Sequence, residues 1–195
     1  MKIPKIPNAY NNEILSIEKY FVSCERKKAF FRFMDNRNRI IATSQAAKYL
    51  RLIDDAQINK VLKDLADELC RETTLLLDAN KRDLSKMDTD NPKYDRLQLT
   101  EERIKSISED VGNITKLPSP LGIVLSSDVR PNGMKIRKIA VPLGVIGIIF
   151  EARPNVTVDV FSLCLKSGNV CVLKGGSDAE NSNKALVEII HKVLK

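Results

Sequence analysis

Two short apolar runs, separated by a segment of helical length, constrain the fold of this chain more than any other feature. The first run spans residues 143–150 (LGVIGIIF), and the second spans residues 170–173 (VCVL). A polar turn, EARPN, follows the first run, and a glycine turn, KGGS, follows the second. The order strand, turn, helix, strand, turn and helix predicts a parallel sheet with crossover helices, whose ligands bind at the carboxyl ends of the strands.

The residues before these runs predict helices. Apolar residues recur at helical spacing over about 54–69, 72–87 and 101–114. Asp54 or Asp55 is suited to cap the first of these helices, and Thr100 the last, because their side-chain oxygens accept hydrogen bonds from first-turn N–H groups. The inward face of the second helix is expected to hold Leu75, Leu76, Ala79 and Leu84.

A β-hairpin and a final helix complete the expected elements. Residues 123–129 and 134–141 flank an Arg-Pro-Asn-Gly turn, and Asn-Gly is a favoured hairpin pair. This hairpin is either an ordinary surface hairpin or an arm that adds to another subunit's sheet. Ser177 and Glu180 have the spacing of a capping box, which predicts that the last helix begins there.

The formal net charge of +7 belongs mostly to residues 1–40, and the rest of the chain is nearly balanced. This distribution argues against a nucleic-acid surface built into the fold. We expect residues 1–42 to form an atypical basic, poorly ordered leader, in which 14–21 has the spacing of a short helix. No apolar run approaches the roughly 18 residues of a membrane span, and no secretory signal is visible, so we expect a cytoplasmic protein.

Chemistry is expected at the two turns. Lys174-Gly175-Gly176-Ser177, between a strand and a helix, is suited to phosphate or ribose oxygens, although it matches neither a dinucleotide fingerprint nor a Walker loop. Arg153 is suited to a carboxylate or phosphate, and Asn155 to a developing oxyanion. The alternative is that Asn155 or Thr157 caps the helix while Arg153 pairs with a surface acid.

Cysteine and histidine usage argues against a metal centre and a disulfide framework. The four cysteines have no C-x-x-C spacing, and His191 is the single histidine. Cys164 and Cys171 lie in apolar surroundings without a nearby base, which indicates buried structural residues rather than nucleophiles.

Three segments together resemble a known family. Residues 91–122, 130–136 and 141–183 resemble the γ-glutamyl phosphate reductases, also called glutamate-5-semialdehyde dehydrogenases, of the aldehyde dehydrogenase superfamily. The resemblance runs from about Thr43 to Lys195 and leaves the leader outside. It implies an α/β fold with N-terminal helices, a β-hairpin and an incomplete Rossmann-like parallel sheet. It also implies NADPH-dependent reduction of L-glutamyl 5-phosphate to the semialdehyde in proline biosynthesis, through a cysteine thioester.

The resemblance also assigns roles to residues. Phe150, Glu151 and the Lys174–Ser177 turn would bind the cofactor, and Lys174, Gly175, Gly176 and Ser177 would lie near its adenosine ribose and phosphate. Asn155 would stabilise the oxyanion and Arg153 would bind the anionic substrate, while the hairpin at about 123–141 would form homo-oligomers. No metal, nucleic acid or membrane is implied.

The family's nucleophilic cysteine belongs to a catalytic domain further along, and neither Cys164 nor Cys171 stands at its position. Residues 43–195 are therefore expected to form a partial NADP-binding domain, inactive alone, from a truncated or split gene. The alternative is a non-enzymatic remnant or interaction module that pairs through its hairpin and sheet edge.

Overall fold

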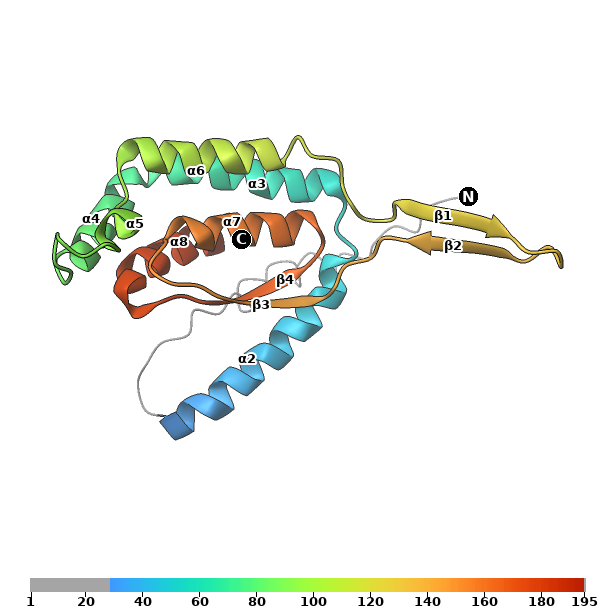
Figure 1. The fold of residues 1–195 in the computed structure, drawn as a ribbon, viewed down its shortest axis with the longest axis horizontal. Helices are drawn as coiled ribbons and strands as arrows, with labels where there is room; N and C mark the ends of the chain where they lie inside the picture. Colours follow the sequence, from blue (N-terminus) through green and yellow to red (C-terminus); the bar gives the residue numbers. More distant parts are fainter. Residues whose placement is uncertain (1–28, 195) are drawn as a thin grey trace.

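The computed structural model describes residues 29–194 and confirms the α/β fold class (Figure 1). Helices lie against a small parallel sheet, and a β-hairpin projects from one end. The elements in chain order are α2 (Ala29–Leu50), α3 (Asp55–Arg71), α4 (Thr73–Leu84), α5 (Tyr94–Leu97), α6 (Glu101–Ile114), β1 (Val124–Val129), β2 (Lys135–Ile139), β3 (Val145–Ile149), α7 (Asn155–Lys166), β4 (Val170–Lys174), the 3-10 helix η3 (Ser177–Ala179) and α8 (Glu180–Val193).

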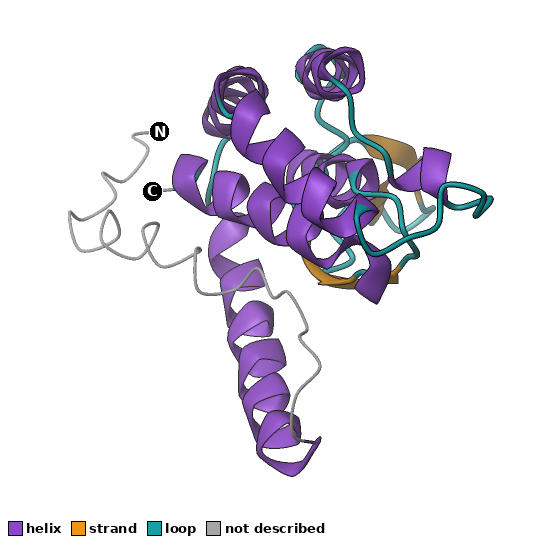
Figure 2. Ribbon diagram, turned by 90° about the vertical axis from the view of Figure 1, so that its left-hand side faces the viewer, coloured by secondary structure: helices purple, strands orange, loops and turns teal. Residues whose placement is uncertain are grey.

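The layers follow from which faces are apolar. Helix α7 covers the β3–β4 sheet and packs in turn against α6 and α3. The C-terminal part of α2 contacts the sheet on the side away from α3 and α6, and the rest of α2 projects from it (Figures 1 and 2). Strands β3 and β4 are parallel, with Val145 opposite Val170 and Ile149 opposite Lys174. The core between these layers contains these fully buried side chains: Leu62, Leu65, Leu69, Leu76, Ile104, Val111, Val158, Phe161, Leu186 and Ile190.

Two of the predicted helix starts are confirmed. Asp54 and Gln57 form a capping box at α3: the Gln57 backbone N–H donates to Asp54 Oδ1 at 2.8 Å, and the Asp54 N–H donates to Gln57 Oε1 at 3.2 Å. The Arg103 N–H donates to Thr100 Oγ1 at 3.2 Å at the start of α6. These caps are local in sequence, so their spacing alone identified them.

The predicted capping box at Ser177 and Glu180 is wrong. Helix η3 intervenes, no side chain within α8 caps that helix, and Glu180 pairs with Lys184 at 3.2 Å. The first-turn N–H groups of α8 are instead satisfied from another element. Asp83, at the end of α4, accepts from the backbone N–H of Asn181 at 3.1 Å and of Ser182 at 2.8 Å.

The prediction that Leu75 lies on the inward face of α4 is also wrong. Leu76 and Ala79 are buried, but Leu75 is 42% exposed. Successive residues are turned by about 100° around a helix axis, and α4 buries the Leu76 side against α8.

The hairpin is confirmed as an antiparallel pair, with Val129 opposite Lys135. Gly133 closes the turn with a positive φ of 81°, and its N–H donates to the carbonyl of Arg130 at 2.8 Å. Every residue of both strands is exposed, and the hairpin extends away from the helical layers (Figure 1).

The expected helix around 14–21 lies outside the described residues, as does most of the basic leader. Helix α2 begins at Ala29, within the segment that the sequence assigned to the leader. None of the helices described between residues 29 and 194 is both long and apolar enough to cross a membrane.

Acid is expected to weaken the contact between α3 and α8. The Glu68 carboxylate, which is 9% exposed, accepts hydrogen bonds from Lys192 and, at 3.2 Å, from Arg71. The Lys192 bond lowers the pKa of Glu68 below its ordinary value, against an opposing effect of burial. The ionised Glu68 carboxylate therefore stabilises the fold fully above the pKa that Glu68 has in the unfolded chain. This stabilisation is lost as the pH falls through the lower pKa of Glu68 in the folded chain.

Glu68→Gln should accordingly lower the melting temperature at about pH 7, and the gap to the unsubstituted chain should close as the pH falls below 4.5 and through the lower folded-state pKa of Glu68. Thermal melts across this range test the prediction. Asp67→Asn, at the exposed neighbouring position on α3, is the matched control and should show no such gap. A gap for Glu68→Gln that persists in acid would contradict the assignment.

Candidate functional site

The two turns singled out in the sequence lie side by side at the carboxyl edge of the sheet. Ile149 pairs with Lys174, and the Phe150 N–H donates to the Lys174 carbonyl at 3.1 Å. A Cβ atom at Gly176 would lie 3.3 Å from the carbonyl carbon of Glu151. The backbones of the two turns therefore approach closely, and we call residues 150–155 and 174–177 the carboxyl edge.

Gly175 is required by a side chain behind the carboxyl edge. A Cβ atom there would collide with the amide nitrogen of Asn183 and lie 3.3 Å from Phe150 Cζ. Asn183 is buried, and its Oδ1 accepts a hydrogen bond from Thr157 Oγ1 at 3.0 Å. Because the Asn183 side chain is hydrogen-bonded to α7, a larger residue at 175 requires either this amide or the turn to shift.

The positive end of α8 is already neutralised. The buried Asp83 carboxylate accepts four hydrogen bonds, from the backbone N–H groups of Asn181 and Ser182 and from their side chains at 2.7 and 2.8 Å. Asp83 therefore already supplies a negative charge at this helix end. The remaining cation of the turn is Lys174, whose exposed ammonium donates only to the Gly175 carbonyl, at 3.3 Å, within the described residues.

Glu151 and Arg153 lie on the outer side of the carboxyl edge. Glu151 is exposed, and its carboxylate is 3.9 Å from the ammonium of Lys93. Arg153 is also exposed and forms no ion pair within residues 29–194, so the alternative that it pairs with a surface acid is not observed there. Its guanidinium is open to an anionic ligand.

Asn155 is the first residue of α7 but does not cap it. The cap position is Pro154, without a side-chain hydrogen bond, and Thr157 is turned inward to Asn183. The Asn155 amide donates one N–H to Asp159 Oδ2 at 3.1 Å. An amide carries two N–H groups, so one remains for a ligand oxygen. Sequence reasoning missed Asp159, although its spacing of four residues from Asn155 places both on one helix face.

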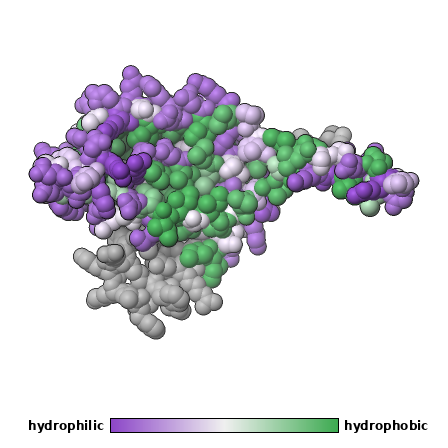
Figure 3. Space-filling model, viewed as in Figure 1, coloured by the Kyte–Doolittle hydropathy of each residue, from purple (hydrophilic) through white to green (hydrophobic). Residues whose placement is uncertain are grey.

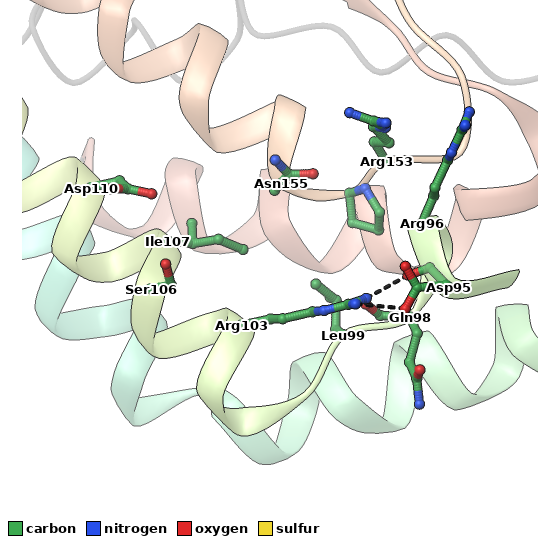
Figure 4. Close-up of a pocket in the computed structure, with 11 residues that line it drawn as sticks. Asp95, Arg96, Gln98, Leu99, Arg103, Ser106, Ile107, Asp110, Arg153 and Asn155 are labelled. Carbon is green, nitrogen blue, oxygen red and sulfur yellow. Dashed lines mark hydrogen bonds and ion pairs between the residues drawn. The ribbon is translucent and has the colours of Figure 1, made fainter. Parts of the chain in front are cut away.

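A cavity of about 310 Å³ opens beside the carboxyl edge (Figure 4). It lies between α6, α5 with the segment after it, and the start of α7. Arg103 is held there by the Gln98 carbonyl at 2.8 Å and by Asp95 Oδ1 at 2.7 Å. The lining side chains are Asp95, Arg96, Gln98, Leu99, Arg103, Ser106, Ile107, Asp110, Arg153, Pro154 and Asn155.

Sequence reasoning missed the eight of the eleven lining residues that come from residues 95–110. They include charged residues as well as the buried Leu99 and Ile107, and the packing of α6 against α7 brings those on α6 to Arg153 and Asn155.

The described cysteines are not placed for catalysis. Cys164 on α7 and Cys171 on β4 are both buried, and they are hydrogen-bonding neighbours. The thiol of Cys164, together with burial, raises the pKa of Cys171, so this residue is a poor source of thiolate. Cys70 is exposed on α3 but lines neither the cavity nor the carboxyl edge. No group of three or more metal-binding side chains occurs within residues 29–194.

Comparison with solved structures defines the class of this fold. A probable aldehyde dehydrogenase from Listeria monocytogenes superposes with a TM-score of 0.61 over 83% of this chain and 33% of its own, at 18% identity. A γ-glutamyl phosphate reductase from Thermotoga maritima superposes with a TM-score of 0.74 over 78% of this chain and 37% of its own, at 39% identity. The described fold is thus similar to that of part of an aldehyde dehydrogenase.

Comparison of sequences identifies one family within this class of fold. Curated γ-glutamyl phosphate reductases of Bacteroides thetaiotaomicron and Bacteroides fragilis are 58% and 56% identical over 161 residues, which is 82% of this chain. No family model matches the chain. The chain belongs to the γ-glutamyl phosphate reductase family, and its match spans 39% of the length of these two relatives, in their N-terminal part.

Proposed function

We propose that this chain supplies the cofactor edge of a cytoplasmic enzyme that reduces L-glutamyl 5-phosphate to L-glutamate 5-semialdehyde with NADPH, in proline biosynthesis. The observation that carries the proposal is the carboxyl edge, where Lys174 and two glycines adjoin the turn that bears Arg153 and Asn155. Relatives named γ-glutamyl phosphate reductase at 56% and 58% identity support the substrate.

The side chains of the carboxyl edge fit a nicotinamide dinucleotide. Lys174 provides an exposed cation for the ribose and phosphate oxygens, beside the half-exposed Gly175 and Gly176 and the exposed Ser177. Phe150 and Glu151 form the wall of the same edge. When bound, NADPH supplies the hydride. Asn155 contributes an N–H to the carbonyl oxygen as it gains charge, and Arg153 holds an anionic group of the substrate.

The nucleophile is proposed to come from outside the described residues. Purified 1–195 is therefore expected to show no NADPH-dependent reduction of L-glutamyl 5-phosphate, and none of the reverse oxidation in the presence of phosphate. The matched segment of this chain, placed in the Bacteroides thetaiotaomicron reductase in exchange for the corresponding segment, should give an active enzyme.

The reverse reaction, followed by absorbance of NADPH, measures both samples. The unaltered Bacteroides enzyme is the positive control, and the same chimera with Lys174→Ala should need about tenfold more NADP for half-maximal rate. A folded chimera without activity, or activity in 1–195 alone, would contradict the proposal.

A second proposal concerns self-association through the hairpin. Its strands expose apolar side chains on a projecting arm, and Figure 3 shows apolar surface at its base. These side chains are 39–66% exposed and comprise Val124, Leu125, Val129, Ile136 and Ile139. An exposed strand with apolar residues is suited to add to a second sheet.

Val129→Lys combined with Ile136→Lys is therefore expected to weaken self-association of 1–195 by about tenfold or more. Sedimentation velocity at several concentrations measures the effect. Ser127→Lys on the same arm is the control, because it removes no apolar surface. If the unsubstituted chain self-associates and the double variant sediments in the same way, the hairpin does not form the contact between copies.

A further inference from the structure

The cavity beside the carboxyl edge carries opposite charges at its two ends. Figure 4 shows Asp110 at one end, Arg96 and Arg153 at the other, and Asn155 between them. Its volume of about 310 Å³ lies at the lower end of the range for small-molecule sites. A ligand that fills it must therefore be small and must carry a cation at one end and an anion at the other.

Asp110 at the acidic end has a second carboxyl group as its neighbour, outside the lining of the cavity. Asp110, on α6, faces Asp159, on α7, and the charge of Asp110 disfavours ionisation of its neighbour. Burial chiefly, and the charge of Asp110 in addition, raise the pKa of Asp159, against the hydrogen bond from Asn155. No cationic side chain pairs with either carboxyl group within residues 29–194. An added ammonium group would relieve this repulsion.

The arginine end has donors that remain open. Arg103 is occupied by Asp95 and by the Gln98 carbonyl, so it serves to hold the rim of the cavity. Arg153 and Arg96 line the cavity, and neither forms an ion pair within the described residues. A guanidinium fork binds a carboxylate or a phosphate with two parallel hydrogen bonds.

We infer that this cavity binds the amino-acid substrate, with its α-ammonium group at Asp110 and its anionic acyl end at Arg153. This inference rests on the proposed function and assigns to Asp110 the selection of amino acids over dicarboxylic acids.

Titration of the ¹⁵N-labelled full chain with three small probes tests the inference. L-Glutamate and 4-aminobutyrate both carry an ammonium group and a terminal carboxylate, whereas glutarate lacks the ammonium group. Amide signals of Ser106, Asp110 and Asn155 should shift saturably with the first two probes. The affinity for glutarate should be about tenfold lower.

Two exposed substitutions separate the ends of the cavity. Asp110→Asn should abolish the preference for L-glutamate over glutarate, while Arg153→Gln should weaken both and leave the preference. Glu109→Gln, the exposed neighbour of Asp110 on α6, should change neither. Equal affinity of the two probes, a preference that survives Asp110→Asn, or no shifts at the cavity would each overturn the inference.

A titration of the same sample with NADPH distinguishes failure of this inference from failure of the proposed function. Shifts at Lys174–Ser177 with NADPH, but none at the cavity with L-glutamate, would remove the assignment of Asp110 and leave the cofactor edge. Shifts at the cavity with L-glutamate, but no response to NADPH, would remove the cofactor edge and leave the assignment of Asp110.

Discussion

Asp83→Ala is expected to lower the free energy of unfolding by about 3 kcal/mol. The Asp83 side chain is fully buried and accepts four hydrogen bonds from Asn181 and Ser182, at 2.7–3.1 Å. Its removal leaves four donors without a partner at the start of α8, and the positive end of that helix loses its counter-charge. Because α8 follows directly from η3 and the glycine turn, the carboxyl edge should loosen as well.

Urea denaturation followed by circular dichroism measures this effect. Asp78→Ala, an exposed acid on the same helix, is the matched control and should change stability by no more than about 0.5 kcal/mol. Asp83→Asn keeps one acceptor and should fall between the two. If Asp83→Ala is as stable as Asp78→Ala, the buried carboxylate does not anchor α8.

Asn80→Ala is expected to cost about 2 kcal/mol. Asn80 lies one turn before Asp83 and is 1% exposed. Its amide donates to the Leu97 carbonyl at 2.8 Å and to Ser182 Oγ at 3.1 Å, and its carbonyl accepts from the Leu99 N–H at 2.8 Å. The substitution leaves buried groups of the segment that borders the cavity without partners, so that segment should become mobile.

The two effects should not add. Asn80 and Asp83 both bond Ser182, so the double variant should be more stable than the sum of the single effects by about 1 kcal/mol. The same urea titrations measure this coupling, and hydrogen exchange of the Leu99 amide reports on the cavity rim. Strict additivity, with an unchanged exchange rate at Leu99, would contradict a shared network.

Local chemistry made much of the fold predictable. The helix cap at Asp54 or Asp55, the Thr100 cap and the Asn-Gly hairpin each depend on residues within a few positions of one another, and the structure confirms them, with Asp54 as the first cap. The two apolar runs predicted the parallel pair because glycine and proline bound them and a helix-length segment joins them.

The predictions that failed concern contacts between residues far apart in the sequence. Ser177 and Glu180 have capping-box spacing, yet a carboxylate nearly a hundred residues earlier, Asp83, takes the helix end. The cavity likewise depends on the packing of α6 against α7, which no periodicity reveals. The sequence pointed to Asn155 but not to its partner Asp159, because a carboxylate on an apolar helix is expected to face solvent.

The most direct test of the account is the affinity of 1–195 for NADPH, measured by isothermal titration with and without Lys174→Ala. The account predicts saturable binding that Lys174→Ala weakens by about tenfold. Lys138→Ala, which removes an exposed cation from the hairpin, should leave the affinity unchanged. Absence of NADPH binding to the folded chain, or binding that is indifferent to Lys174→Ala, would contradict the assignment of the carboxyl edge to the cofactor.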